Sequence, residues 1–148
     1  EWFDKPLKDR YQRPRPFAVN NKSTCGTRYH NPNPKYHHSY PSGWAALGWA
    51  YALILSEIAP DKTEALTARG LAYGKTGVIC NLIWYSDVIA GRVLGAALVA
   101  RLHAEPEFLT NLLAAKEELA AIRAKGLSPE RNCEVEAAAL TISLESTP

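Results

Sequence analysis

The residues of this chain best suited to chemistry are cations near its start. Residues 1–40 carry eight Lys or Arg and three Asp or Glu, whereas residues 41–148 carry nine and twelve. Within the basic part, six residues separate Lys8 from Arg15. Two such cations can hold the oxygens of a small anion such as phosphate. In the alternative interpretation, Asp87 or solvent neutralises both cations and no anion binds.

A cluster of histidines forms a second candidate site. His30, His37 and His38 lie close together in the sequence, with Lys35 among them. Imidazoles act as acid–base groups near neutral pH and also ligate metals. No carboxylate or cysteine lies at ligand spacing from them, so loop histidines that face water are favoured and no metal site is predicted. His103 lies near the expected end of a helix, where the helix dipole accounts for it without chemistry.

The three cysteines lack the spacing of a metal site. Cys25, Cys80 and Cys133 form no CxxC pair, which disfavours zinc. An odd number allows one disulfide and one thiol. Cys80 ends a short apolar run and is expected to be a buried thiol, whereas Cys25 and Cys133 lie in loop-like sequence and could pair. Spacing alone leaves the connectivity open.

Composition and charge limit the class of protein. A chain of 148 residues with 47% hydrophobic residues suits one folded domain rather than a disordered segment. The formal net charge of +2 is too near neutral to indicate a nucleic-acid-binding protein, and two arginines beside Tyr11 and Phe17 are a weak signal for one. The longest run without charge or strong polarity, residues 43–55, is about thirteen residues long and too short to cross a bilayer.

The elements that must position these residues are helices. Residues 1–41 contain six of the ten prolines, so we expect an irregular segment after a short N-terminal helix. Residues 42–148 are rich in Ala and Leu, with apolar residues at helical spacing and almost no strand-like alternation. The sequence therefore predicts an all-α fold and a single domain over 1–148, with a basic, proline-rich segment and a helical core.

Five helices are predicted in the core, over residues 42–58, 61–74, 86–103 and 106–126 and from Ser128-Pro129 onward. Asp61 is expected to cap the second of these helices. Gly91 and Gly95 lie one turn apart in the third, where they would let another helix approach closely. Leucines on the fourth form a stripe that is either core or a subunit contact, namely Leu109, Leu112, Leu113 and Leu119.

Three short motifs follow one another along the chain. They read Lys8-x6-Arg15-Pro16, Pro41-Ser42-Gly43-Trp44 and Thr76-Gly77-x5-Ile83-x3-Asp87. Their order and spacing resemble the K-x6-RP, PSGH and SR-x5-H-x3-D motifs of the type-2 phosphatidic acid phosphatase (PAP2) superfamily, and within it the bacterial class A non-specific acid phosphatases. The similarity covers roughly residues 5–115 and implies a helical bundle. Family members carry a helical segment before the lysine motif, so the resemblance implies that this chain lacks an N-terminal helical portion.

The resemblance assigns a role to each residue that keeps the motif. The family hydrolyses phosphomonoesters through a covalent phosphohistidine, without a cofactor. Lys8 and Arg15 match the ligands of the phosphate oxygens. Ser42 and Gly43 match the hydroxyl and backbone N–H donors at the start of a helix, a place that favours anions. Asp87 matches the carboxylate that orients the nucleophilic imidazole.

Other positions depart from the family pattern. Ile83 stands at the nucleophilic histidine, Trp44 at the histidine that acts as general acid, and Gly77 at the second phosphate-binding arginine, with Thr76 at the serine before it. Isoleucine has no lone pair, and an indole does not protonate an alkoxide. The resemblance therefore implies lost phosphatase activity, because a set of catalytic residues that has lost its nucleophile retains almost none of its catalytic rate.

Two interpretations of the altered pocket remain open. In the favoured one, Trp44 fills the former phosphate site as a packed side chain. In the other, Trp44, Ile83 and Gly77 line an apolar cavity roofed by the indole. In either case Asp87 needs a new cation, because a buried carboxylate must pair or become protonated. We expect that cation to be Arg15 or Lys8.

The sequence thus predicts an acid-phosphatase-like pseudoenzyme with a scaffold, assembly or binding role. The alternative is an enzyme with altered chemistry or residual phosphomonoester hydrolysis, in which His37 and His38 act in a more apolar pocket. We expect weak binding of phosphate or another small anion, and a partner that is a second copy or an N-terminal portion of the same parent protein. The family context implies a periplasmic or secreted protein, consistent with a disulfide.

Overall fold

Helices make up all the regular elements in the part of the chain that the computed structural model describes, residues 3–26, 38–127 and 132–145. In chain order they are α1 (Lys5–Tyr11), α2 (Pro16–Asn20), α3 (Gly43–Ile58), the 3-10 helix η3 (Pro60–Lys62), α4 (Thr63–Ile79), α5 (Tyr85–Leu102), α6 (Pro106–Ala124) and α7 (Cys133–Glu145). The expected all-α class is confirmed. Within the described ranges, pairing of extended backbone is limited to an isolated bridge between Pro14 and His38.

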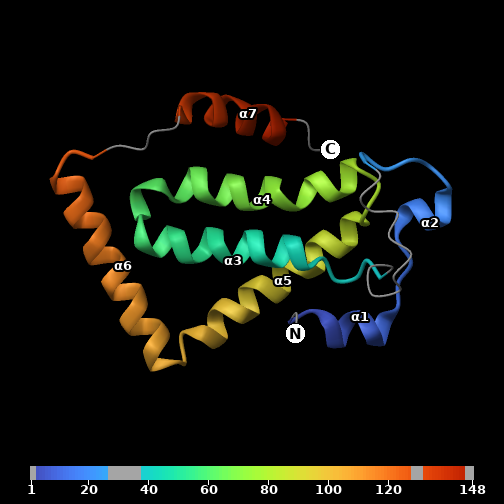
Figure 1. Cartoon of the computed structure of the whole chain (residues 1–148), viewed down its shortest axis with the longest axis horizontal. Coiled ribbons are helices and arrows are strands. Elements are labelled where there is room, and N and C mark those ends of the chain that lie inside the picture. Colours follow the sequence, from blue (N-terminus) through green and yellow to red (C-terminus); the bar gives the residue numbers. More distant parts are fainter. Residues whose placement is uncertain (1–2, 27–37, 128–131, 146–148) are drawn as a thin grey trace.

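Small residues let α3 pack closely against both α4 and α5 (Figure 1). A Cβ atom at Gly91 or Gly95 of α5 would collide with the carbonyl oxygen of Ser42 or Ala46. On the other side of α3, a Cβ at Gly70 of α4 would lie 2.5 Å from the Cβ of Ala52. The close approach predicted from Gly91 and Gly95 is therefore confirmed, and the partner is α3.

The predicted ends of α3 are confirmed, but the predicted start of the next helix is wrong. Asp61 does not cap α4, which begins at Thr63 after the 3-10 helix η3. The Asp61 carboxylate is instead engaged by Arg123 of α6, whose Nη1 donates to Oδ1 at 2.9 Å. The predicted end of α4 at Gly74 is also wrong, because the helix continues to Ile79. Gly74 packs against Ala45 and Val88 inside the helix.

The leucine stripe of α6 contributes little to the core. Only Leu112 of that stripe is buried, whereas 46% of Leu109 and 58% of Leu113 is exposed. In Figure 1, α6 runs at a steep angle to α3 and α4 along one end of the molecule and does not lie flat on them. The predicted start of the last helix, Ser128-Pro129-Glu130, lies outside the described residues. None of the helices in the described ranges has the length and apolar character to traverse a membrane.

A disulfide joins the N-terminal segment to the helical core, between Cys25 and Cys80. The expected pairing of Cys25 with Cys133 and the expected thiol at Cys80 are therefore wrong. The chain after α2 lies against the end of α4, where Asn20 and Asn81 exchange side-chain hydrogen bonds at 2.8 and 3.1 Å. Cys133 is exposed and begins α7, which starts near the opposite end of α4 (Figure 1).

Candidate functional site

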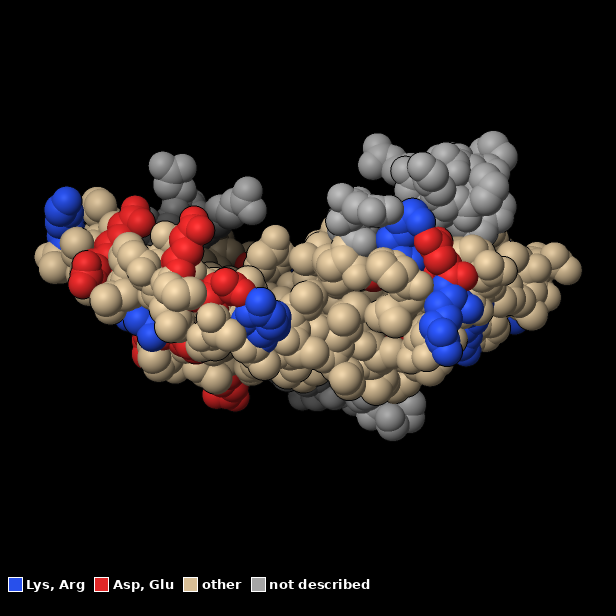
Figure 2. All heavy atoms as spheres, turned by 90° about the horizontal axis from the view of Figure 1, so that it is seen from below, with Lys and Arg blue, Asp and Glu red and all other residues tan. Residues whose placement is uncertain are grey.

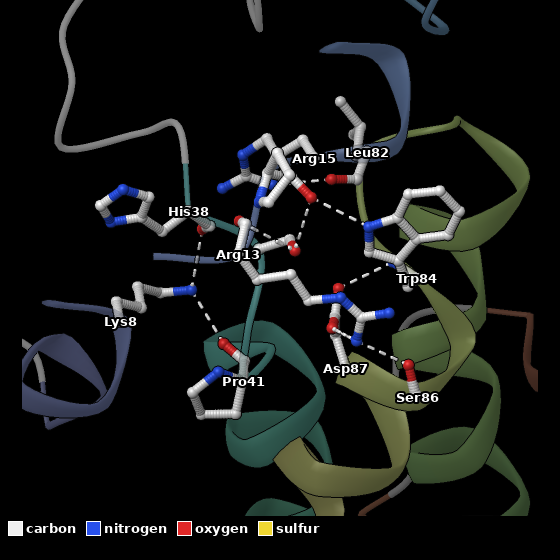
Figure 3. Close-up of polar contacts among 11 residues, drawn as sticks. Lys8, Arg13, Arg15, His38, Pro41, Leu82, Trp84, Ser86 and Asp87 are labelled. Atoms are coloured by element: carbon white, nitrogen blue, oxygen red, sulfur yellow. Dashed lines mark hydrogen bonds and ion pairs between the residues drawn. The ribbon is translucent and has the colours of Figure 1, made fainter. Parts of the chain in front are cut away.

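The motif residues meet where α3 and α5 begin, next to the segment between α1 and α2. Asp87 lies in the first turn of α5, and its side chain is fully buried. Its Oδ1 accepts a hydrogen bond from Arg13 Nη1 at 2.7 Å, and its Oδ2 accepts one from the backbone N–H of Trp84 at 2.8 Å (Figure 3). The carboxylate thus caps α5 and forms an ion pair at the same time.

The cation that neutralises Asp87 is Arg13, not Arg15 or Lys8 as expected. Arg13 also donates to Ser86 Oγ at 2.7 Å, and its guanidinium lies 5.5 Å from the ring centre of Trp84. The indole in turn donates from Nε1 to the carbonyl oxygen of Pro14 at 2.9 Å. These contacts fix the path of the arginine-containing segment and bring Arg13 over the start of α5.

Arg15 lies at the start of α2, where it is half-buried and donates from Nη1 to the Leu82 carbonyl oxygen at 2.9 Å. Lys8, on α1, donates from Nζ to the carbonyl oxygens of Pro41 at 2.8 Å and His38 at 3.3 Å. It also faces Asp4, with 3.4 Å between Nζ and Oδ2. Burial lowers the pKa of Lys8, and the Asp4 carboxylate opposes that shift.

Ser42 and Gly43 begin α3 as the motif predicts. The Ser42 hydroxyl accepts a hydrogen bond from Ala45 N at 3.2 Å, and the Ser42 N–H donates to the Asp87 carbonyl oxygen at 3.0 Å. The two motif segments are therefore joined through backbone as well as through packing. The carboxylate of Asp4, which is 4% exposed, lies against Gly43, because a Cβ there would collide with Asp4 Oδ2.

At two of the positions where the sequence is expected to depart from the family motif, Ile83 packs against Gly77. Ile83 is 7% exposed and belongs to the core cluster with Ala45, Leu82 and Val88. It lies directly over Gly77, since a Cβ at that glycine would be 2.7 Å from Ile83 Cδ1. The isoleucine thus takes up space that a larger side chain at position 77 would need.

Trp44 does not fill a pocket as a packed side chain, so the favoured interpretation of its role is wrong. Its side chain is 59% exposed, and its ring lies 6.3 Å from that of Tyr73 on α4. The reason is helical periodicity: Trp44 shares a face of α3 with Tyr51 and Leu55, which are also exposed, while Ala45 faces the core.

The histidine cluster lies mostly outside the described residues, which do not include His30, Lys35 or His37. His38 is half-buried, and its imidazole points away from Asp87 in Figure 3. Among the described residues no three His, Cys, Asp or Glu side chains are grouped as a metal site would need. On the face in Figure 2, Lys and Arg gather at the end that carries α1, and acidic side chains are more numerous at the opposite end.

The comparisons agree with the family resemblance of the sequence. Residues 1–108 match the pattern of the PAP2 superfamily. The chain is 44% identical over 116 residues to a non-specific acid phosphatase of Providencia stuartii, an alignment that covers 78% of this chain and 46% of that protein. It is 45% identical over 109 residues to a non-specific acid phosphatase of Salmonella typhimurium, with 74% and 43% covered.

An acid phosphatase of Zymomonas mobilis is 32% identical over 123 residues, with 83% of this chain and 46% of that protein covered. This chain belongs to the PAP2 superfamily. It spans somewhat less than half the length of these relatives.

Proposed function

We propose that this chain is an acid-phosphatase-like protein without phosphatase turnover, which keeps a binding or scaffold role. The observation that carries the proposal is the buried Ile83 at the position of the motif's nucleophile. A phosphohistidine needs a ring nitrogen with a lone pair, and the aliphatic side chain has none. Asp87, which would orient that imidazole, is engaged by Arg13 and the backbone of Trp84 instead.

The remaining losses act on other parts of the same reaction. A general acid must protonate the leaving alkoxide, and the indole of Trp44 does not do so. Cations must neutralise the equatorial oxygens in the transition state, and Gly77 supplies none. Because Ile83 stands at the position of the nucleophile itself, Trp44 and Gly77 add little to the loss of catalytic rate.

The residues that keep the motif support a role in anion binding. Lys8 donates to the Pro41 carbonyl oxygen beside the start of α3, where the helix dipole favours an anion, and Arg15 is a second cation on the same N-terminal segment. Both cations already donate to backbone carbonyl oxygens, so we expect weak affinity for phosphate. The imidazole of His38 points away from Asp87, which argues against an enzyme that uses it with that carboxylate. The disulfide supports an oxidising compartment, periplasmic or extracellular.

Turnover of a chromogenic aryl phosphate between pH 5 and 7 tests the proposal. We expect the rate to equal that of buffer alone. Activity well above this background, abolished by Lys8→Ala, would contradict it, since a contaminating phosphatase would not respond to that substitution.

A second experiment restores the family residues at the three altered positions and looks for a gain of phosphatase activity. The triple variant Trp44→His, Gly77→Arg and Ile83→His should gain measurable phosphatase activity. Positions 77 and 83 must change together, because Ile83 occupies the space over Gly77. A triple variant that folds, as judged by its circular dichroism, and gains no activity would contradict the claim that these three positions carry the loss.

A further inference from the structure

Asp4 is a buried acidic residue at this site that the three motifs do not include. It immediately precedes α1, and 5% of its side chain is exposed. Its Oδ2 faces the ammonium group of Lys8 at 3.4 Å. The same oxygen lies against Gly43, the first residue of α3. A carboxylate is therefore held between a cation and the positive end of a helix.

This position has the features that favour a bound oxyanion. The first N–H groups of a helix have no partners within the helix, and α3 is 16 residues long, so its start carries a positive potential. The glycine at position 43 makes room for the carboxylate, because a Cβ would collide with Oδ2. Lys8 supplies the full positive charge that a phosphate would also need.

We propose that the Asp4 carboxylate acts as an internal anion, which a phosphate or similar oxyanion must displace in order to bind beside Lys8 and the start of α3. The inference rests on the proposed function in its claim that these groups form an anion site. A tethered carboxylate competes at a high effective concentration, and a phosphate that enters beside it meets a like charge. Asp4 therefore sets the anion affinity of the site.

Calorimetric titration with inorganic phosphate, on the full chain, tests this role. Asp4→Asn keeps the shape of the side chain and removes its charge, and we expect it to bind phosphate at least about tenfold more tightly than the unmodified chain. Asp9→Asn is the matched control, because Asp9 is on α1 but is exposed and pairs with Lys5. We expect the control to bind phosphate as the unmodified chain does. Lys8→Ala combined with Asp4→Asn should abolish the gain.

The outcomes separate this inference from the proposed function. If the unmodified chain and Asp4→Asn bind phosphate equally well, the inference is wrong and the anion site stands. If neither binds, both the inference and the anion site are wrong. Asp4→Ser provides a second variant without the charge, with the same expected gain. If both Asp4 variants unfold, the carboxylate is required by the fold and cannot be displaced, which also overturns the inference.

Discussion

At the scale of single residues, Ile83 and Gly77 form a matched pair. The isoleucine side chain lies where a Cβ at position 77 would be, with 2.7 Å to Cδ1 and 2.8 Å to Cγ1. Interiors packed at crystal-like density do not absorb such an overlap without displacement. Gly77 and Ile83 are therefore compatible with each other, whereas Ile83 combined with an arginine at position 77 would be strained.

Because of this contact, the effect of Gly77→Ala on stability should change sign when Ile83 is replaced by alanine. Gly77→Ala alone should destabilise the protein by about 1–3 kcal/mol through overpacking. In an Ile83→Ala background the same change should stabilise it by roughly 1 kcal/mol, because alanine is the better helix former on α4. Urea denaturation of the four proteins measures both effects. Effects of Gly77→Ala that agree within about 0.5 kcal/mol in the two backgrounds would contradict the packing argument.

The pairing of Arg13 with Asp87 allows a second test at this scale. Asp87→Ala removes the carboxylate that neutralises Arg13 and accepts from the Trp84 N–H, so we expect a loss of about 3 kcal/mol in the free energy of unfolding. In a double-mutant cycle, Asp87 should couple strongly to Arg13 and much less to Arg15, which serves as the matched control. A larger coupling with Arg15 would contradict the assigned pair and restore the pairing expected from sequence.

Sequence alone predicted which motif residues gather, but not how they pair. The resemblance to the family motifs implied that Ser42 and Asp87 belong to one site, and they are joined by a backbone hydrogen bond. Arg13 and Arg15 belong to one Arg-Pro-Arg-Pro run, and nothing in their spacing tells which guanidinium reaches Asp87. That choice depends on the path of the segment, which distant contacts such as Trp84 Nε1 to Pro14 determine.

At the scale of elements, helical periodicity predicted where most helices lie. It predicted less well which of their faces are buried and at which residues they begin and end. The core helices were predictable because Ala and Leu recur at helical spacing over long stretches. Which apolar face is covered depends on neighbours far away in sequence, so Trp44 is exposed against expectation. On α6, Leu109 and Leu113 are exposed, which rules out the core alternative for these two leucines. The start of α4 was missed for a similar reason, because Arg123 from α6 engages Asp61.

His103 ties the end of α5 to α3, and this link should depend on pH. Its Nδ1 lies 2.8 Å from the Val99 carbonyl oxygen and its Nε2 lies 3.1 Å from Glu57 Oε2. The hydrogen bond to Val99, followed by that to Glu57, raises the pKa of His103, while desolvation and, to a smaller extent, nearby Lys116 oppose the shift. A pKa raised in the folded state means that the stabilisation is complete below about pH 6.5 and is lost as the pH rises through the folded value.

Thermal unfolding between pH 5.5 and 8.5 measures this contribution. The Tm difference between the unmodified chain and His103→Gln should be largest at the acidic end and should shrink as the pH rises. Thr110→Ala is a suitable control, because Thr110 lies on the exposed surface of α6 and carries no titratable group. A difference that is constant over this range would show that His103 contributes without its charge.

At the scale of the whole molecule, two parts of the chain supply the site. Lys8, Arg13 and Arg15 come from the N-terminal segment, whereas Ser42 and Asp87 come from the helical core. The disulfide between Cys25 and Cys80 spans 55 residues and links these two parts. Both the retained cations and the helix starts that they face therefore depend on how firmly the N-terminal segment is held.

The disulfide should contribute a large part of the stability with which the N-terminal segment is attached to the helical core. In the chain-entropy account, closing a loop of this length stabilises the folded state by about 4 kcal/mol. Cys25→Ser combined with Cys80→Ser should therefore lower the urea midpoint strongly, while Cys133→Ser, which leaves the disulfide intact, should not change it. Phosphate binding should weaken in the double variant even where its helices persist, because Lys8 and Arg15 would no longer be held against α3 and α5. Unfolding and titration curves that coincide with those of the unmodified chain would show that the contacts of Arg13, Pro14 and Phe17 with the core hold the segment without the cross-link.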